Sequence, residues 1–190
     1  MHTRSPELET ELIRKCRAGQ SQFYEPLVRA YEQEANRVAV AMLRDRDAAR
    51  DAVQEAFIKA YRSLGRFDLG RSFRPWFLQI LRNQCRDMLR RRKAGFDVER
   101  MDGVLAERLP GSSSPERERH RTEAAELLWR GLGQISVEHR EVLVMKELEG
   151  LNYAEIAQAV GIPEGTVASR LFHARRALRD ALERMGVEYP

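Results

Sequence analysis

The stretch NYAEIAQAVGIPEGTVASRLFHARRALRDAL, residues 152–182, has the pattern of two helices joined by a tight turn. Asn152 and Glu155 have the spacing of a capping box, in which two side chains satisfy free backbone amides at a helix start. Gly161 can take the positive φ angle of a sharp turn, and Pro163 suits the first turn of a second helix. This order of signals is typical of a helix-turn-helix.

The second of these helices has one apolar and one polar side. Apolar residues recur along a single stripe at Val167, Leu171, Ala174, Leu178 and Ala181. The opposite side should therefore be exposed, and it can enter the major groove of DNA. We predict a DNA-binding face made of Thr166, Ser169, Arg170, Phe172, His173 and Arg176, with Arg175 and Arg179 beside it for phosphates. A solvated charged face on an ordinary three-helix domain is the alternative.

Upstream, helix-start and helix-stop signals predict four more helices. Starts are expected at Ser5, Ser21, Asp47 and Ser72, and glycines 19 and 65 are expected to end the first and third helices. Residues 65–71 should form a loop. These helices predict a four-helix domain over residues 1–95.

A turn-rich run, PGSSSP at 110–115, predicts a flexible linker over residues 96–114. Beyond it, helices are expected to begin at Ser114-Pro115 and at Ser136 and to end at Gly131 and Gly150. The helix from Ser136 should turn Val142, Leu143, Met145 and Leu148 inward. The second domain should cover residues 115–190. The predicted fold class is all-α, with two small helical domains.

The end of the fourth helix is strongly basic and follows an aromatic group. Asp87 is the one acid among Arg82, Arg86, Arg90, Arg91, Arg92 and Lys93. Aromatic rings beside cations suit the unstacked bases of single-stranded nucleic acid. We predict that such a strand is held by Phe67, Trp76, Asn83, Arg86, Arg90 and Arg91. The charges would also complement the helix C-terminus, and Trp76 and Phe77 could be core residues, which we favour for Phe77.

The third helix instead carries an exposed acidic side with Asp51, Gln54 and Glu55. An acidic face should not point at DNA, so it indicates a protein partner or simple solvation.

Composition excludes several other classes of protein. Lys and Arg total 33 against 29 Asp and Glu, so the net charge of +4 identifies no partner by itself. Cys16 and Cys85 lie in no metal-binding or disulfide pattern, and no apolar run could span a bilayer, so we expect a cytoplasmic chain without membrane insertion. The four histidines are scattered and no phosphate-binding loop is present. The sequence therefore predicts no catalytic residue, metal or cofactor.

Several ordered motifs resemble those of the extracytoplasmic-function sigma factors of bacteria, above all the envelope-stress members. They are DAVQEAFIKAYR at 51–62, FRPWF at 73–77 with RRR at 90–92, YAEIA at 153–157, and GTVASRL at 165–171 with Ala174-Arg175. The resemblance implies that the first domain, called region two in this family, binds the clamp helices of the largest subunit of core RNA polymerase and melts the minus-ten promoter element. It implies that the second domain, called region four, sits at the flap of the other large subunit and binds the minus-thirty-five element.

The same resemblance implies roles for single residues. Polymerase docking would involve Asp51, Gln54, Glu55 and Ile58. Phe67 and Asn83 match positions around a flipped base of the minus-ten strand. Ser169, Phe172, His173 and Arg176 fall in the segment that binds the minus-thirty-five element, and an anti-sigma factor is expected as a further partner.

The chain departs from the family pattern at Ala168 and His173, where many relatives carry arginine, so we expect an altered minus-thirty-five preference. Two rival functions compete with this interpretation. A helix-turn-helix repressor or activator acting without polymerase leaves the 51–62 match unexplained, and a helical adaptor would not bind DNA at all.

Overall fold

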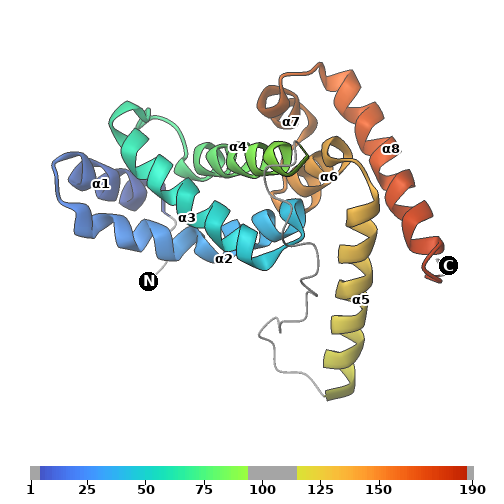
Figure 1. The fold of residues 1–190 in the computed structure, drawn as a ribbon. Helices are drawn as coiled ribbons and strands as arrows, with labels where there is room; N and C mark the ends of the chain where they lie inside the picture. The colour runs from blue at the N-terminus through green and yellow to red at the C-terminus, as the bar shows by residue number, and fades with distance from the viewer. Residues whose placement is uncertain (1–4, 94–114, 188–190) are drawn as a thin grey trace. The chain divides into compact units, whose positions relative to one another are not determined.

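The computed structural model describes residues 5–93 and 115–187, with side chains from 124 onward in the second range. Every regular element in these two ranges is a helix, and the chain divides into two compact units (Figure 1). The first unit carries α1 to α4 and the second carries α5 to α8. The all-α, two-domain prediction is confirmed. The expected linker, residues 96–114, lies outside the described residues.

The first unit begins with α1 (Pro6–Arg17), whose cap is the predicted one. The Ser5 hydroxyl accepts a hydrogen bond from the Leu8 amide at 3.2 Å, and Gly19 follows the helix with a φ of 85°. Ser21, however, opens a 3-10 turn, η1 (Ser21–Tyr24), and α2 (Glu25–Leu43) starts four residues later than predicted. Pro26 explains the later start, because a residue without an amide hydrogen suits the first helical turn.

The next two helices are α3 (Arg46–Ser63) and α4 (Phe73–Lys93). Asp47 lies inside the first turn of α3 rather than before it. Gly65 does not end the helical path, because a 3-10 turn, η2 (Leu64–Arg66), continues through it before Phe67 becomes extended. The predicted loop therefore begins at Phe67.

Aromatic rings fill the core of the first unit. Phe77 on α4 stacks on Phe57 of α3, with 4.3 Å between the ring centroids. The Phe73 ring lies nearly parallel to the Phe77 ring, with 5.8 Å between their centroids. Tyr31 of α2 packs 5.5 Å from Phe73, and its hydroxyl donates to the buried Glu9 carboxylate. Phe77 is thus a core residue, as favoured from the sequence.

The second unit consists of α5 (Pro115–Gln134), α6 (Val137–Leu143), the π-helical turn η3 (Val144–Leu148), α7 (Tyr153–Val160) and α8 (Glu164–Glu183). Figure 1 shows α5 and α8 side by side, and their residues make many contacts. The Ser136 cap is confirmed, since its hydroxyl accepts from the His139 amide at 3.2 Å.

Two predictions for this unit were wrong. Gly131 does not end α5; it is buried against α8, where an added Cβ would lie 2.9 Å from Leu182 and 3.1 Å from Leu178. This glycine therefore serves close packing. The sequence pattern predicts that Leu148 faces inward, but it is 46% exposed, because the π-helical turn changes the angular register of its side chains.

Candidate nucleic-acid interfaces

The turn between α7 and α8 has the predicted helix-turn-helix chemistry. The Glu155 amide donates to Asn152 Oδ1 at 2.9 Å, and the Asn152 amide donates to Glu155 Oε2 at 2.7 Å, which completes the capping box. Gly161 ends α7 with a φ of 75°, and its amide donates to the Ala157 carbonyl at 2.8 Å. Pro163 is the cap of α8 rather than its first residue.

Helix α8 presents the expected polar side to solvent. Val167, Leu171 and Ala174 have no measurable exposure and pack into the core of the unit. Around the opposite side, the exposed residues include Thr166, Ser169, Phe172, His173 and Arg176, whereas Arg170 is half-buried. Phe172 is 63% exposed, a large apolar surface on an otherwise polar helix face. An exposed face of this kind can contact both base edges and thymine methyl groups.

Arg175, expected from the sequence to meet phosphates, makes an ion pair that the sequence did not indicate. Its Nη2 donates to Glu147 Oε1 at 2.8 Å, which joins α8 to the π-helical turn η3. Hydrogen bonding to this carboxylate raises the pKa of Arg175. The side chain therefore braces the second helix of the helix-turn-helix against η3.

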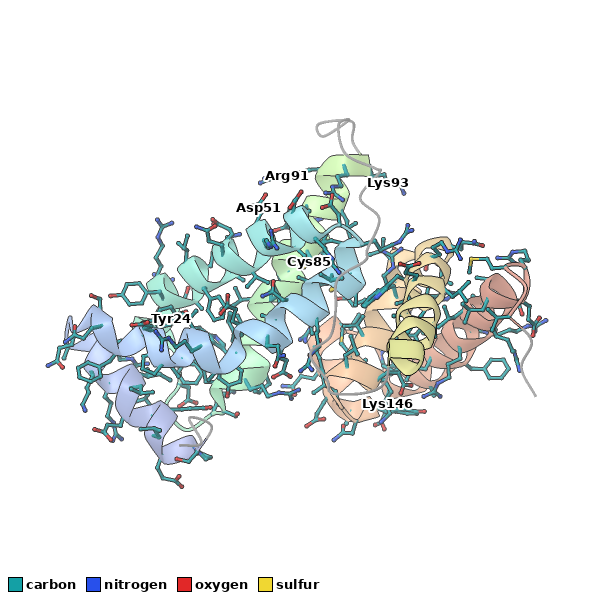
Figure 2. The ribbon with its side chains drawn as sticks, turned by 90° about the horizontal axis from the view of Figure 1, so that it is seen from below. Tyr24, Asp51, Cys85, Arg91, Lys93 and Lys146 are labelled. Atoms are coloured by element: carbon teal, nitrogen blue, oxygen red, sulfur yellow. The ribbon has the colours of Figure 1, made fainter. Side chains whose placement is uncertain are left out.

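On α4, the residues predicted to bind the minus-ten strand differ in their exposure and in their side-chain partners. Asn83 is exposed, and Arg86 Nη2 donates to its Oδ1 at 2.6 Å. Because arginine can only donate, this contact holds the amide oxygen and leaves the amide hydrogens as the donors for a further partner. Arg90 forms an ion pair with Asp87, and Figure 2 labels the exposed Arg91 and Lys93 near the end of the helix.

Arg82 does not belong to this basic surface. Its side chain is only 2% exposed, so the prediction that counted it with the basic end of α4 was wrong. Arg82 falls on the inner side of α4 with Leu78, Leu81 and Cys85, which are all buried. Helical periodicity places these positions, three or four residues apart, on one side of the helix.

The Phe67 ring is also buried, with 5% of its surface exposed. It packs against Trp76 at 4.7 Å and against Phe73 at 6.1 Å between centroids. The sequence-based expectation of a ring open to an unstacked base is therefore not met in this conformation, because the ring contributes to the aromatic core instead. Trp76, which packs against it, is half-buried.

Sequence reasoning missed Arg17, the last residue of α1. Its Nε donates to the Leu64 carbonyl at 2.8 Å, and its Nη2 donates to the Phe67 carbonyl. The two acceptors lie at the two ends of η2, because Leu64 is its first residue and Phe67 follows its last. No local pattern could have indicated this contact, because the partners are 47 and 50 residues away in the sequence.

The candidate polymerase-binding residues share the outer side of α3. Asp51 and Gln54 are exposed, Glu55 is half-buried and Ile58 is 37% exposed (Figure 2 labels Asp51). Tyr61, one turn further on, is also 37% exposed and extends this side with a second apolar group. The inner side of the helix packs Val53, Ala56 and Phe57 into the core. The arrangement offers an apolar patch beside acidic and amide groups.

Other chemistry is not indicated in the described ranges. Cys16 and Cys85 are both buried thiols, and burial raises the pKa of Cys16. Residues 5–93 and 124–187 contain no group of three or more side chains suited to hold a metal ion. None of the helices described is both long and apolar enough to cross a membrane.

Each of the two units matches the model of a known protein family. Residues 27–95 match the model of sigma-70 region 2, and residues 125–178 match that of sigma-70 region 4. The first match contains α3, α4 and most of α2, and the second contains α7 and most of α8.

Relatives of known type cover nearly the whole chain. The RNA polymerase sigma-H factor of Pseudomonas aeruginosa is 34% identical over 183 residues, which is 93% of this chain and 95% of that protein. The ECF RNA polymerase sigma-E factor of Escherichia coli K12 is 30% identical over 178 residues, covering 90% of this chain and 93% of that protein. The chain therefore belongs to the extracytoplasmic-function sigma factors.

Solved structures share the fold. The sigma factor RpoE from Bartonella quintana, solved in complex with the anti-sigma factor NepR, superposes with a TM-score of 0.69 at 21% identity, over 84% of this chain and 96% of that one. CnrH, solved in complex with the cytosolic domain of CnrY, gives a TM-score of 0.63 at 24% identity, over 92% and 97%.

The turn geometry yields a matched pair of substitutions at Gly161. An added Cβ would meet no atom within 4 Å, so the cost of a side chain there is conformational. Gly161→Val should lower the free energy of unfolding of the second unit by about 1–2 kcal/mol, because a β-branched residue is strained at positive φ. Gly161→Asn should cost less, since asparagine tolerates this region. Chemical denaturation followed by circular dichroism measures both, and equal costs would contradict the assignment of strain.

Proposed function

We propose that this chain is the promoter-specificity subunit of RNA polymerase, with residues 1–95 acting as region two, 96–114 as the linker and 115–190 as region four. As a sigma factor it directs transcription initiation by core polymerase at particular promoters. The observation that carries the proposal is the presence of both family segments on one chain, each with an exposed face of suitable chemistry. The chemistry of RNA synthesis belongs to the polymerase, and the chain has no catalytic role of its own.

The outer side of α3 is the proposed contact with the largest polymerase subunit. Ile58 supplies exposed apolar surface, while Asp51 and Gln54 supply charge and hydrogen-bonding groups around it. Interfaces commonly combine an apolar centre with a polar rim. Exposed Arg62 lies on the same side as Ile58, so the polar groups around the apolar centre carry both signs of charge, which suits a protein partner.

The loop after η2 and the exposed side of α4 are proposed to hold the melted minus-ten strand. Asn83 presents its amide hydrogens to a base, and Arg86 keeps the carboxamide in that orientation. Arg90 and Arg91 lie further along the helix, where phosphates of the strand would pass. Phe67 supports the loop from inside, against Trp76, rather than stacking directly on a base.

The exposed side of α8 is proposed to bind the minus-thirty-five duplex in the major groove. Ser169, His173 and Arg176 face base edges, Phe172 faces a thymine methyl, and Thr166 and Arg170 lie nearer the backbone. Ala168, where many relatives have arginine, shortens the reach of this helix and alters its preferred sequence.

Regulation is proposed from the relatives. Two solved structures with this fold hold an anti-sigma factor or a cytosolic partner domain, and we propose that this chain is likewise sequestered by an anti-sigma factor in the cytoplasm until a stress signal releases it.

Run-off transcription with purified core polymerase tests the proposed function directly. The full-length chain should confer initiation at discrete sites, and Ile58→Asp should abolish it by placing a charge in the apolar centre of the docking face. If the chain binds duplex DNA equally well with and without core enzyme and gives no specific initiation, it is a repressor instead. Neither DNA binding nor specific initiation would indicate an adaptor.

The role of Asn83 can be separated from docking. Asn83→Ala should reduce open-complex formation about tenfold, as expected for the loss of one base contact worth roughly 1–3 kcal/mol, and should leave core binding unchanged. Permanganate reactivity of the melted strand measures the first quantity, and fluorescence anisotropy measures the second. Gln33→Ala, which removes an exposed amide from α2, is the control. Equal loss of opening and core binding would contradict the assignment.

Arg176 and Arg179 distinguish base contacts from phosphate contacts on α8. Arg176→Ala should weaken upstream recognition by about 1–3 kcal/mol and relax the sequence preference at one base pair. Arg179→Ala should weaken binding about equally on all sequences and reduce its salt dependence. Footprinting on a promoter and on its single-base variants measures both effects. An unchanged footprint would remove Arg176 from the site.

A further inference from the structure

We propose that α1 positions the promoter-binding loop of the first unit, and that Arg17 is the positioning residue. The inference rests on the proposed function, in which this loop and Asn83 take up the melted minus-ten strand. It adds to that function a helix which lies outside the matched family segment, since that segment starts at residue 27.

Arg17 holds two backbone carbonyls, one at the start of η2 and one at Phe67, where the loop begins. One guanidinium donates through Nε to the Leu64 carbonyl at 2.8 Å and through Nη2 to the Phe67 carbonyl. The Leu64 carbonyl also accepts from the Phe67 amide at 3.1 Å, which is compatible because a carbonyl oxygen has two lone pairs. The planar guanidinium fixes both acceptors in one orientation, which a lysine ammonium cannot do.

The loop beyond Phe67 has its own short-range order. The Gly70 amide donates to Asp68 Oδ1 at 2.9 Å, and the Arg71 amide donates to the Asp68 carbonyl at 3.0 Å. The Phe67 side chain is held in the aromatic core. Arg17 fixes the start of the loop, and the buried Phe67 ring anchors it to the core. The loop therefore has one position before DNA binds, so less conformational entropy is lost on binding.

The neighbouring cations of α1 do not share this role. Lys15 pairs with Glu11 at 2.7 Å and lies 4.6 Å above the Phe23 ring, while Arg14 is exposed. Arg17 is therefore distinguished from them by its partners rather than by its charge. This difference supplies the control for the experiment.

The test uses the full-length chain assembled with core polymerase, on promoter templates that carry each base at the minus-ten positions. Arg17→Ala should reduce open-complex formation about tenfold and flatten the discrimination between bases, with core affinity unchanged. Arg17→Lys keeps the charge but loses the two-carbonyl geometry, so it should show most of the same loss.

Two matched variants identify the cause. Arg14→Ala removes the same charge from the same helical turn and should discriminate as the unsubstituted chain does. Ser5→Ala removes the α1 cap, so it weakens the helix without touching the loop, and it should lower the melting temperature without changing base discrimination.

The outcomes are distinguishable. If the unsubstituted chain initiates specifically but Arg17→Ala and Arg17→Lys retain its base discrimination, the positioning role is wrong while the proposed function stands. The role is also overturned if Arg14→Ala or Ser5→Ala reproduces the Arg17 defect, because charge or helix stability would then be the cause. If the unsubstituted chain gives no specific initiation, the proposed function fails first and the inference fails with it.

Discussion

The aromatic packing between α2, α3 and α4 is the constraint on which the first unit depends. Phe57, Phe73 and Phe77 are stacked or nearly parallel, and Tyr31 closes the cluster from α2. Large rings buried in this way dominate the apolar surface removed from water. Because α3 and α4 must both turn these residues inward, their remaining sides are directed outward, and those sides differ in charge.

This division of faces explains how one small unit can serve two partners. The outer side of α3 carries Asp51 and Gln54 around Ile58, and the outer side of α4 carries Asn83 and Arg91. The exposed side of α4 is mainly basic near its end, whereas that of α3 combines acidic, basic, amide and apolar groups. In the second unit, packing between α6, α7 and α8 likewise decides which side of α8 is exposed. Because Val167 and Leu171 are buried in this core, Phe172 and Arg176 face solvent.

Local signals in the sequence predicted much of this architecture. Helix starts at Ser21 and Asp47 were displaced by a few residues, and the π-helical turn exposed Leu148. The remaining errors concern contacts between distant segments. Ser5, Ser136 and the Asn152–Glu155 pair cap helices as expected, because these features depend on residues three positions apart. Phe67 and Arg82 have residue types that suggest a nucleic-acid surface, yet tertiary packing buries both. Arg175 pairs with Glu147, 28 residues earlier, and Arg17 binds the Leu64 and Phe67 carbonyls, 47 and 50 residues later. The periodicity of one helix cannot show which of its polar residues another segment will cover or bind.

Hydroxyl-radical footprinting of side chains tests the separation of surfaces most directly. We expect Ile58 and Tyr61 to lose reactivity when core polymerase is added without DNA, whereas Phe172 should stay reactive until the upstream duplex is supplied. Full reactivity of Ile58 and Tyr61 in the assembled complex would contradict the assignment of α3 to the polymerase.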